Sequence, residues 1–222
     1  EDITGIGWWY NINAADFNKD GHMDYFIGNL GLNNKFGAND EKPFHVFCDD
    51  FDDSGNLDIV LSKEKKGKFL PVRGRECSSQ QMPFIKEKFP TFKSFAEADL
   101  SAIYGQDKLT GALHYTVNNF ESVVLINDGT GQFKSMSLPV EAQYGPTLCS
   151  EIIDINNDGH LDIIGAGNIY NSEVETLRYD ASKGYILLGD GTGEFKYHTN
   201  SGFKVDGNVK DMSIINVGSK KM

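Results

Sequence analysis

Three short acidic segments share one pattern and constrain this chain more than any other feature of its sequence. They align without gaps at residues 16–24 (DFNKDGHMD), 50–58 (DFDDSGNLD) and 154–162 (DINNDGHLD). Each follows an apolar or aromatic stretch and precedes a short run rich in β-branched and aromatic residues. A unit of strand, acidic loop and strand is therefore repeated along the chain, which predicts an all-β fold built from similar units.

Positions 1, 3, 5 and 9 of every loop carry a side-chain oxygen, as a Ca²⁺ site requires. Ca²⁺ takes about six to eight oxygen ligands, and a tight loop supplies them when alternate residues point inward. Position 7 is expected to contribute its backbone carbonyl with its side chain facing out, and position 6 is a glycine that permits the sharp turn. The expected ligands are Asp16, Asn18, Asp20, His22 and Asp24 in the first loop, Asp50, Asp52, Ser54, Asn56 and Asp58 in the second, and Asp154, Asn156, Asp158, His160 and Asp162 in the third.

Three other interpretations of these loops fit the sequence less well. An EF-hand loop ends in a bidentate Glu at position 12, whereas position 12 here is Ile27, Leu61 or Gly165. Asp, Asn and Gly are common in plain turns, but three copies in one phase disfavour that reading. Zinc is disfavoured because His22 and His160 have no Cys or His partner at ligand spacing. The sequence therefore predicts up to three structural calcium ions.

A second repeat completes the predicted unit. Residues 125–133 (LINDGTGQF) match residues 187–195 (LLGDGTGEF). In both, an apolar strand enters an Asp-Gly-Thr-Gly turn and an aromatic-bearing strand leaves it, which is typical of a β-hairpin. A unit of four short strands, two around the acidic loop and two around the turn, predicts the blade of a β-propeller.

One stretch breaks this pattern. From 80 to 109 the alternation is lost, prolines stand at 83 and 90, and the apolar residues take helical spacing. We expect a short helical insertion over residues 78–110, inside the second blade and lying over a rim of the propeller. A lid that binds a partner is the alternative role for this insertion. Residues 1–222 as a whole are expected to form a partial propeller.

The D-x-N-x-D-G-x-x-D loops between strands resemble FG-GAP or VCBS repeats, the blades of integrin α-type propellers. The stretches GNLGLNNKF, DDFDDSGNLD, DLSAIYG and GNIYNSEVETLRYDASKGYILLGDGTGEF further resemble bacterial surface proteins of this group, including relatives with an ASPIC/UnbV domain. The resemblance covers most of the chain. Propellers of this family typically have seven blades, so the resemblance implies about three to four blades here. It also fits the expectation that Glu1 and Met222 are cut edges of a longer protein.

Charge and composition exclude some classes of function. A formal net charge of −11 argues against a nucleic-acid partner, which needs a basic face. No apolar run approaches the roughly 18–20 residues that cross a bilayer, so no membrane span is expected in this chain. Three cysteines leave the disulfide question open, since either one disulfide with a free thiol or three free thiols suits Cys48, Cys77 and Cys149.

The first functional hypothesis is a non-catalytic binding module. Calcium loops of modest charge suit the millimolar calcium found outside cells, which indicates an extracytoplasmic place: cell surface, outer membrane-associated or secreted. The family resemblance implies a bacterial cell-surface protein whose partner is a glycan or another protein. The aromatic residues considered for a binding face are Trp8, Trp9, Tyr170 and Tyr179.

The alternative is a calcium-dependent polysaccharide lyase, or another carbohydrate-active enzyme, on a propeller scaffold. Such chemistry needs a His or Tyr base beside a cation that acidifies the sugar proton. The pairs His114 with Tyr115 and Tyr170 with Arg178 are the candidates. No nucleophile elbow or phosphate loop is present, and we assign no catalytic residue. A scaffold within a larger envelope assembly is a third possibility.

Overall fold

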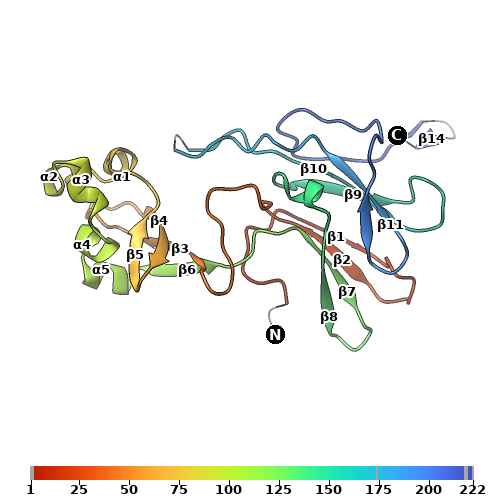
Figure 1. The fold of residues 1–222 in the computed structure, drawn as a ribbon, viewed down its shortest axis with the longest axis horizontal. Helices are drawn as coiled ribbons and strands as arrows, with labels where there is room; N and C mark the ends of the chain where they lie inside the picture. Colours follow the sequence, from red (N-terminus) through yellow and green to blue (C-terminus); the bar gives the residue numbers. More distant parts are fainter. Residues whose placement is uncertain (1–2, 174, 218–219, 222) are drawn as a thin grey trace. The chain divides into compact units, whose positions relative to one another are not determined.

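A computed structural model describes residues 3–173, 175–217 and 220–221. The described strands form three antiparallel four-stranded sheets and one two-stranded pair, so the protein is mostly β, as predicted (Figure 1). The chain divides into two compact units. Unit 1 comprises Glu1–Lys35, Asn119–Ser172 and Leu177–Met222, and unit 2 comprises Phe36–Asn118 and Glu173–Thr176.

The first sheet of unit 1 combines two strands that precede residues 36–118 of unit 2 in the sequence with two strands that follow them. Its order is β1-β2-β7-β8. The first acidic loop joins β1 to β2, and the first Asp-Gly-Thr-Gly turn joins β7 to β8. Phe26 lies opposite Val124 in the β2–β7 pairing, and both side chains are fully buried. The strand bounds are Asn11–Ala15 for β1, Asp24–Gly28 for β2, Val123–Asn127 for β7 and Phe133–Ser137 for β8.

The second sheet of unit 1 repeats this construction without an insertion. Its order is β12-β11-β10-β9, with the third acidic loop between β9 and β10 and the second Asp-Gly-Thr-Gly turn between β11 and β12. The bounds are Cys149–Ile153 for β9, Asp162–Ala166 for β10, Tyr185–Gly189 for β11 and Phe195–Tyr197 for β12. The chain between the two sheets includes a 3₁₀ turn, η1 (Val140–Gln143), and the pair β13 (Asn216–Val217) and β14 (Lys220–Lys221) follows the second sheet.

The two sheets of unit 1 share one apolar core. Its buried members come from both sheets, and Phe17 meets Phe195 edge to face with ring centroids 5.2 Å apart. At the edge strands, the Asn13 amide donates to the backbone oxygen of Ser150 at 2.6 Å. The core residues are Phe17, Phe26, Val124, Leu138, Ala142, Ile163, Tyr185 and Leu187.

Unit 2 has its own sheet and its own helices. The sheet order is β5-β4-β3-β6, and the second acidic loop joins β3 to β4. The strand bounds are Phe44–Asp49 for β3, Asp58–Lys65 for β4, Lys68–Pro71 for β5 and Leu113–Val117 for β6. Between β5 and β6 the chain forms five short helices: α1 (Arg75–Gln81), α2 (Phe84–Lys88), α3 (Phe92–Ala96), α4 (Leu100–Tyr104) and α5 (Gln106–Gly111).

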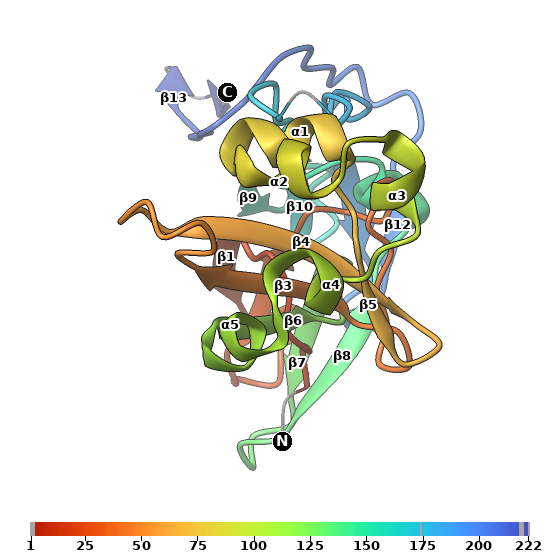
Figure 2. The ribbon, with the colours of Figure 1, turned by 90° about the vertical axis from the view of Figure 1, so that its left-hand side faces the viewer.

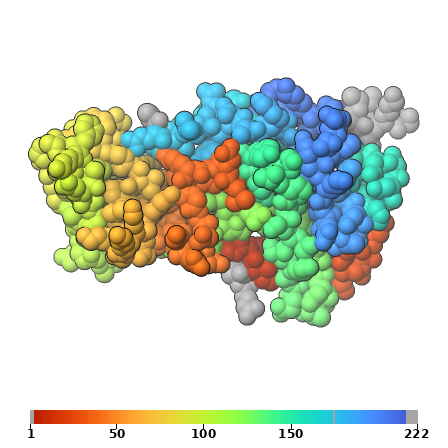
Figure 3. Space-filling model, viewed as in Figure 1, coloured from red at the N-terminus to blue at the C-terminus, as the bar shows by residue number. Residues whose placement is uncertain are grey.

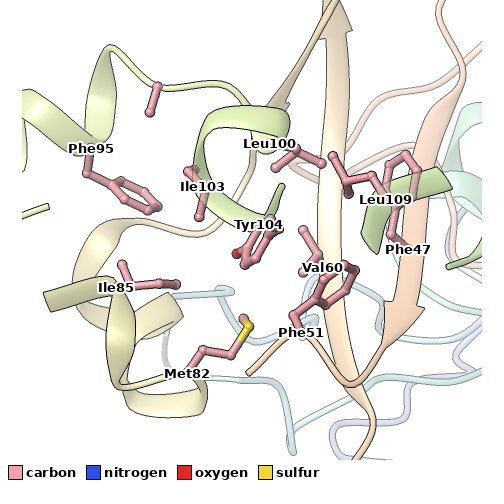
Figure 4. Close-up of a cluster of buried hydrophobic side chains, with 11 residues drawn as sticks. Phe47, Phe51, Val60, Met82, Ile85, Phe95, Leu100, Ile103, Tyr104 and Leu109 are labelled. Atoms are coloured by element: carbon pink, nitrogen blue, oxygen red, sulfur yellow. The ribbon is translucent and has the colours of Figure 1, made fainter. Parts of the chain in front are cut away.

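The helices of unit 2 cover one face of its sheet. Helices α4 and α5 lie against β5 and β3 (Figure 2). Side chains from β3, β4 and the helices converge in this layer, where Phe51 meets Tyr104 with ring centroids 4.8 Å apart (Figure 4). The buried set is Phe47, Phe51, Val60, Met82, Ile85, Phe95, Ala98, Leu100, Ile103, Tyr104 and Leu109. In the space-filling view the residues of this unit form one continuous packed body (Figure 3).

The sheets do not follow one another along the chain, because the sheet of unit 2 is inserted within the first sheet of unit 1. The order of the loops implies sheets that follow one another, whereas the second acidic loop belongs to a unit inserted between β2 and β7. The helical stretch runs from Arg75 to Gly111, within the sheet of the second loop. In the described ranges no helix combines the length and hydropathy needed to cross a membrane. All three cysteines are free thiols.

Candidate metal-binding loops

The three acidic loops share one backbone conformation. Position 4 and position 6 both lie in the left-handed region of φ in every loop. A side chain at such a position costs roughly 1–2 kcal/mol, and Asn and Asp tolerate it best. The recurrence in three sequences shows that the loop dictates its own shape. The φ values are 60° for Lys19, 57° for Asp53 and 58° for Asn157 at position 4, and 86° for Gly21, 86° for Gly55 and 89° for Gly159 at position 6.

The carboxylate at position 1 organises each loop. In the first loop Asp16 accepts hydrogen bonds from the backbone N–H groups of Asp20, at 3.1 Å, and Gly21, at 3.0 Å. The same two bonds recur in the other loops, onto Asp50 from Ser54 and Gly55, and onto Asp154 from Asp158 and Gly159. These bonds fix the carboxylate at position 1 against the backbone of its own loop.

The carboxylate at position 9 ties each loop to its sheet. Asp24 accepts from the backbone N–H of Phe17 at 2.9 Å and from that of Asn127, on β7, at 2.8 Å. Asp162 repeats this geometry, accepting from Ile155 at 2.8 Å and from Gly189, on β11, at 3.0 Å. Both carboxylates are fully buried.

In the second loop, Asp58 at position 9 has a different second partner. It accepts from the backbone N–H of Phe51 at 3.1 Å and from the side-chain amide of Gln81, on α1, at 3.0 Å. Its surroundings are also more acidic. One oxygen each of Asp50, Asp52 and Asp58 lie within 4.8 Å of one another, the only such group of three that the described residues contain. Carboxylate oxygens at this spacing are suited to a hard cation such as Ca²⁺.

The protonation of these carboxyls follows from their surroundings. Hydrogen bonds from the backbone N–H groups of His22 and His160 hold the pKa values of Asp20 and Asp158 below the usual range. The N–H of Gly55 lowers the pKa of Asp50 in the same way. Burial raises the pKa of Asp58, and the charges of Asp50 and Asp52 add to this effect. The second loop therefore concentrates acidic groups around a buried carboxyl.

Position 3 differs between the units. In unit 1 it is an asparagine, and its amide donates to the carboxylate at position 5: Asn18 to Asp20 at 2.8 Å and Asn156 to Asp158 at 2.7 Å. An amide also carries a carbonyl oxygen, which can serve as a cation ligand. The donor sets of the first and third loops therefore consist of oxygens too. Each of the three loops has three carboxylates at its ligand positions, because the second loop has Asp52 at position 3 but Ser54 at position 5.

A lysine lies beside the second loop. The ammonium of Lys108, on α5, donates to the backbone oxygens of Asp50, at 3.0 Å, and Phe51, at 3.1 Å. It also pairs with the Asp53 carboxylate at 2.7 Å. This side chain already offsets part of the loop's negative charge.

The histidines at position 7 contact the Asp-Gly-Thr-Gly turns. A Cβ on Gly129 would lie 2.2 Å from Nε2 of His22, and one on Gly191 would lie 2.3 Å from Nδ1 of His160. The prediction that position 7 faces outward is wrong for His160, which is half-buried. Its Nδ1 is buried and finds no hydrogen-bond partner within the described part of the chain. The first glycine of each turn thus makes room for the histidine of the neighbouring loop.

The structure separates one pair proposed from sequence and joins the other. His114 and Tyr115 are neighbours on β6, so their side chains point to opposite faces of the sheet. His114 instead contacts His45 of β3, a residue that sequence reasoning missed because only the pairing of β3 with β6 brings the two together. The Arg178 guanidinium lies 4.6 Å from the ring centroid of Tyr170.

The other aromatic candidates are spread over unit 1. Trp8 packs edge to face on Phe120, with ring centroids 5.2 Å apart. Trp9 lines a cavity of about 390 Å³ together with Tyr10 and Ile12. Tyr179 is bridged to Ile169 through backbone hydrogen bonds.

We compared the chain with known proteins by family, by sequence and by fold. No protein-family model, no curated protein and no solved structure matches it.

Proposed function

We propose that this chain is a calcium-stabilised binding module whose three acidic loops each hold one structural Ca²⁺. The observation that carries the proposal is the common loop geometry, with left-handed positions 4 and 6 and a position 1 carboxylate that accepts two backbone N–H groups. The ligands would be the side chains at positions 1, 3, 5 and 9 and the backbone carbonyl at position 7, as the sequence predicts.

The physical role of the ion would be to link strands. Each loop connects two neighbouring strands of one sheet, and its carboxylates repel one another when no cation is bound. A bound cation converts that repulsion into a connection between the strands, so its binding free energy adds to folding free energy. Asp50, Asp52 and Asp58 are the clearest case, since their oxygens already gather within 4.8 Å.

The wider setting follows as part of the same proposal. We infer that the sheets are blades of a propeller of the FG-GAP or VCBS type, because the two sheets of unit 1 share strand order, loop and turn and pack through one core. Loops of this charge suit millimolar calcium, which favours an extracytoplasmic location. The partner would be a glycan or another protein at a cell surface.

Thermal unfolding with and without calcium tests the metal sites. The melting temperature is expected to rise when millimolar calcium replaces a chelator, with a gain of about 2.7 kcal/mol per site at about 100 times Kd. Asp20→Ala and Asp158→Ala remove a ligand from the first and third loops and should each reduce the rise.

Asp99→Ala is the matched control. Asp99 also accepts a backbone N–H, from Ala102 at 2.9 Å, but it caps helix α4 and belongs to no acidic loop. This variant should unfold at a lower temperature in the chelator while keeping the full calcium-dependent rise. An unchanged melting temperature of the parent chain in millimolar calcium would refute the metal role of the loops.

A further inference from the structure

Unit 2 contains a cavity that none of the acidic loops uses. Its volume is about 390 Å³, within the range of roughly 300–1,000 Å³ that small-molecule sites occupy. It lies between the helix-covered face of the sheet and helices α4 and α5, with walls from β3, β5, β6 and both helices. Rigid elements therefore position the side chains that line it.

One wall of the cavity is aromatic. Phe47 and His114 stack in parallel, with ring centroids 4.1 Å apart and planes 6° apart. Phe69 meets both rings edge-on, at 5.4 Å from Phe47 and 5.9 Å from His114. Phe47 is only 3 % exposed and packs behind His114, so Phe69 and His114 form the accessible part of this wall, against which one flat face of a ligand can pack.

The rest of the lining is polar and carries no net charge. Lys68 and Asp99 form an ion pair at 3.4 Å, so their charges cancel. Ser101, Gln106 and Thr110 add hydroxyl and amide groups. These side chains both donate and accept hydrogen bonds, which a ligand with many hydroxyl groups can satisfy.

A second histidine supports the aromatic wall from behind. His45 is 5 % exposed, and its Nδ1 lies 3.0 Å from Nε2 of His114. One proton fills that contact, so the tautomer of each ring fixes that of the other. Nε2 of His45 is buried without a hydrogen-bond partner among the described residues, which costs stability. An arrangement of this cost is typical of binding sites, where pre-positioned side chains matter more than stability.

We propose that this cavity binds an uncharged sugar residue. A pyranose ring offers a C–H face for the rings of Phe69 and His114 and a hydroxyl edge for the polar side chains opposite. The balanced charges of Lys68 and Asp99 disfavour phosphorylated and strongly cationic ligands. The assignment rests on the proposed role as a binding module and names its ligand class, but it does not require calcium in the loops.

Saturation-transfer-difference NMR with three methyl glycosides tests the site. The probes are methyl α-D-glucopyranoside, methyl β-D-galactopyranoside and methyl α-D-mannopyranoside, each added to the whole chain. At least one should receive saturation. His114→Ala, which removes part of the aromatic wall, should weaken its binding about tenfold.

Two further variants separate binding from folding. Asp99→Asn removes the charged acceptor but keeps a side chain that caps α4, so it should weaken binding while the fold persists. Tyr115→Ala lies on the opposite face of β6, where Tyr115 is 61 % exposed, and should leave binding unchanged.

Three results would overturn the sugar assignment. The folded chain could fail to saturate any of the glycosides, or His114→Ala and the parent chain could give equal saturation signals with the same glycoside. The third result is saturation of adenosine with none of the glycosides. The titration is run in calcium and in chelator alongside the melting experiment. A calcium-dependent melt without sugar binding overturns this inference only, and sugar binding without a calcium effect overturns only the metal role of the loops.

Discussion

Units 1 and 2 use the same acidic loop but anchor its last carboxylate to different partners. In unit 1, Asp24 and Asp162 each accept a backbone N–H from the third strand of their own sheet. In unit 2, Asp58 accepts the side-chain amide of Gln81 from helix α1. The loop conformation is the same in all three places, so it does not depend on the anchor. We expect the type of anchor to set how much the last carboxylate contributes to the free energy of unfolding of its unit.

The comparison also shows what the insertion does to the first sheet. The anchor of Asp162 lies 27 residues along the chain, and that of Asp58 lies 23 residues along. The anchor of Asp24 lies 103 residues along, beyond the segment Phe36–Asn118 that makes up most of unit 2. Contacts of large sequence separation form slowly, because the entropy of closing the intervening chain must be overcome first. Residues 36–118 therefore separate β2 from β7 in the sequence, and we expect the pairing of these two strands to form late in folding.

The largest expected effect comes from removing a backbone-anchored carboxylate. Asp162→Ala leaves two backbone N–H groups without an acceptor: that of Gly189, which is buried, and that of Ile155, which is part-buried. At about 1–3 kcal/mol for each unsatisfied group, unit 1 should lose about 2–6 kcal/mol of stability. Denaturant unfolding in a chelator, followed by hydrogen exchange of the amides in β9 to β12, measures this loss without any contribution from calcium.

Asp58→Ala is the comparison for that experiment. It leaves one backbone N–H, that of Phe51, without its acceptor, while the Gln81 amide can turn to water. We expect about 1–3 kcal/mol, read from the amides of β3 to β6. Equal losses in the two variants would show that a side-chain anchor is worth as much as a backbone anchor.

The next effect concerns the turns that only unit 1 possesses. Gly191→Ala places a Cβ 2.3 Å from Nδ1 of His160, in addition to the strain of a φ of 78°. Gly131→Ala carries similar strain, at a φ of 87°, but meets no atom within 4 Å. We expect roughly 1–2 kcal/mol for Gly131→Ala and about 1–3 kcal/mol more for Gly191→Ala, measured by denaturant unfolding.

A double variant shows whether the histidine causes the difference. His160→Ala combined with Gly191→Ala should recover the additional loss and leave only the strain. If the stability losses of the two single variants simply add, the contact between His160 and residue 191 is not the cause of the additional loss. In unit 2 position 7 is Asn56, which is exposed, so Asn56→Ala should change stability little.

A smaller effect is a pH-dependent loss of stability that we expect in unit 2, where two histidines lie in contact. Burial lowers the pKa of His45, with repulsion from His114 adding to it, and burial also lowers the pKa of His114. The unfolded chain therefore takes up these protons first as the pH falls below about 6.5, and stability is lost between that pH and the folded-state pKa values. Hydrogen exchange should show β3 and β6 losing protection from pH 7 to pH 5.

Replacement of the buried histidine should reduce this pH response. His45→Phe removes one of the two titrating groups, so the protection of β3 and β6 should lose the part of its pH dependence that comes from His45 and keep the part that comes from His114. Asp20 and Asp50 do not interfere, because their lowered pKa values keep both carboxylates ionised over this interval. An unchanged pH response in His45→Phe would place its origin elsewhere in unit 2.

The sequence predicts the local units well because each is specified by short-range chemistry. The loops, their flanking strands and the Asp-Gly-Thr-Gly hairpins all follow from residues within one segment. The nesting of unit 2 does not, since strand pairing such as Phe26 with Val124 joins residues far apart. One signal was available: the chain has three acidic loops but two Asp-Gly-Thr-Gly turns, and the second loop is the one without a matching turn.

Side-chain environments were harder to predict than strands. The left-handed φ at position 4 could not be predicted from residue type, because the three loops have different residues there: Lys19, Asp53 and Asn157. Only the assembled sheet brings His45 beside His114. The cavity in unit 2 depends on how five short helices fold back over that sheet, which no periodicity in residues 75–111 specifies.

The smallest effect, and the most direct test of the comparison between the loops, concerns Lys108. Its ammonium lies beside the second loop and repels an incoming cation, while its hydrogen bonds to Asp50 and Phe51 support the empty loop. Lys108→Met should therefore lower the melting temperature in a chelator, yet tighten calcium binding by the second loop in calorimetric titration. Lys93→Met removes the same charge from an exposed site on α3, where Lys93 pairs with Glu97. If both variants tighten calcium binding equally, net charge is the cause. If only Lys108→Met does so, the lysine beside the second loop, which also pairs with Asp53, is what weakens calcium binding there.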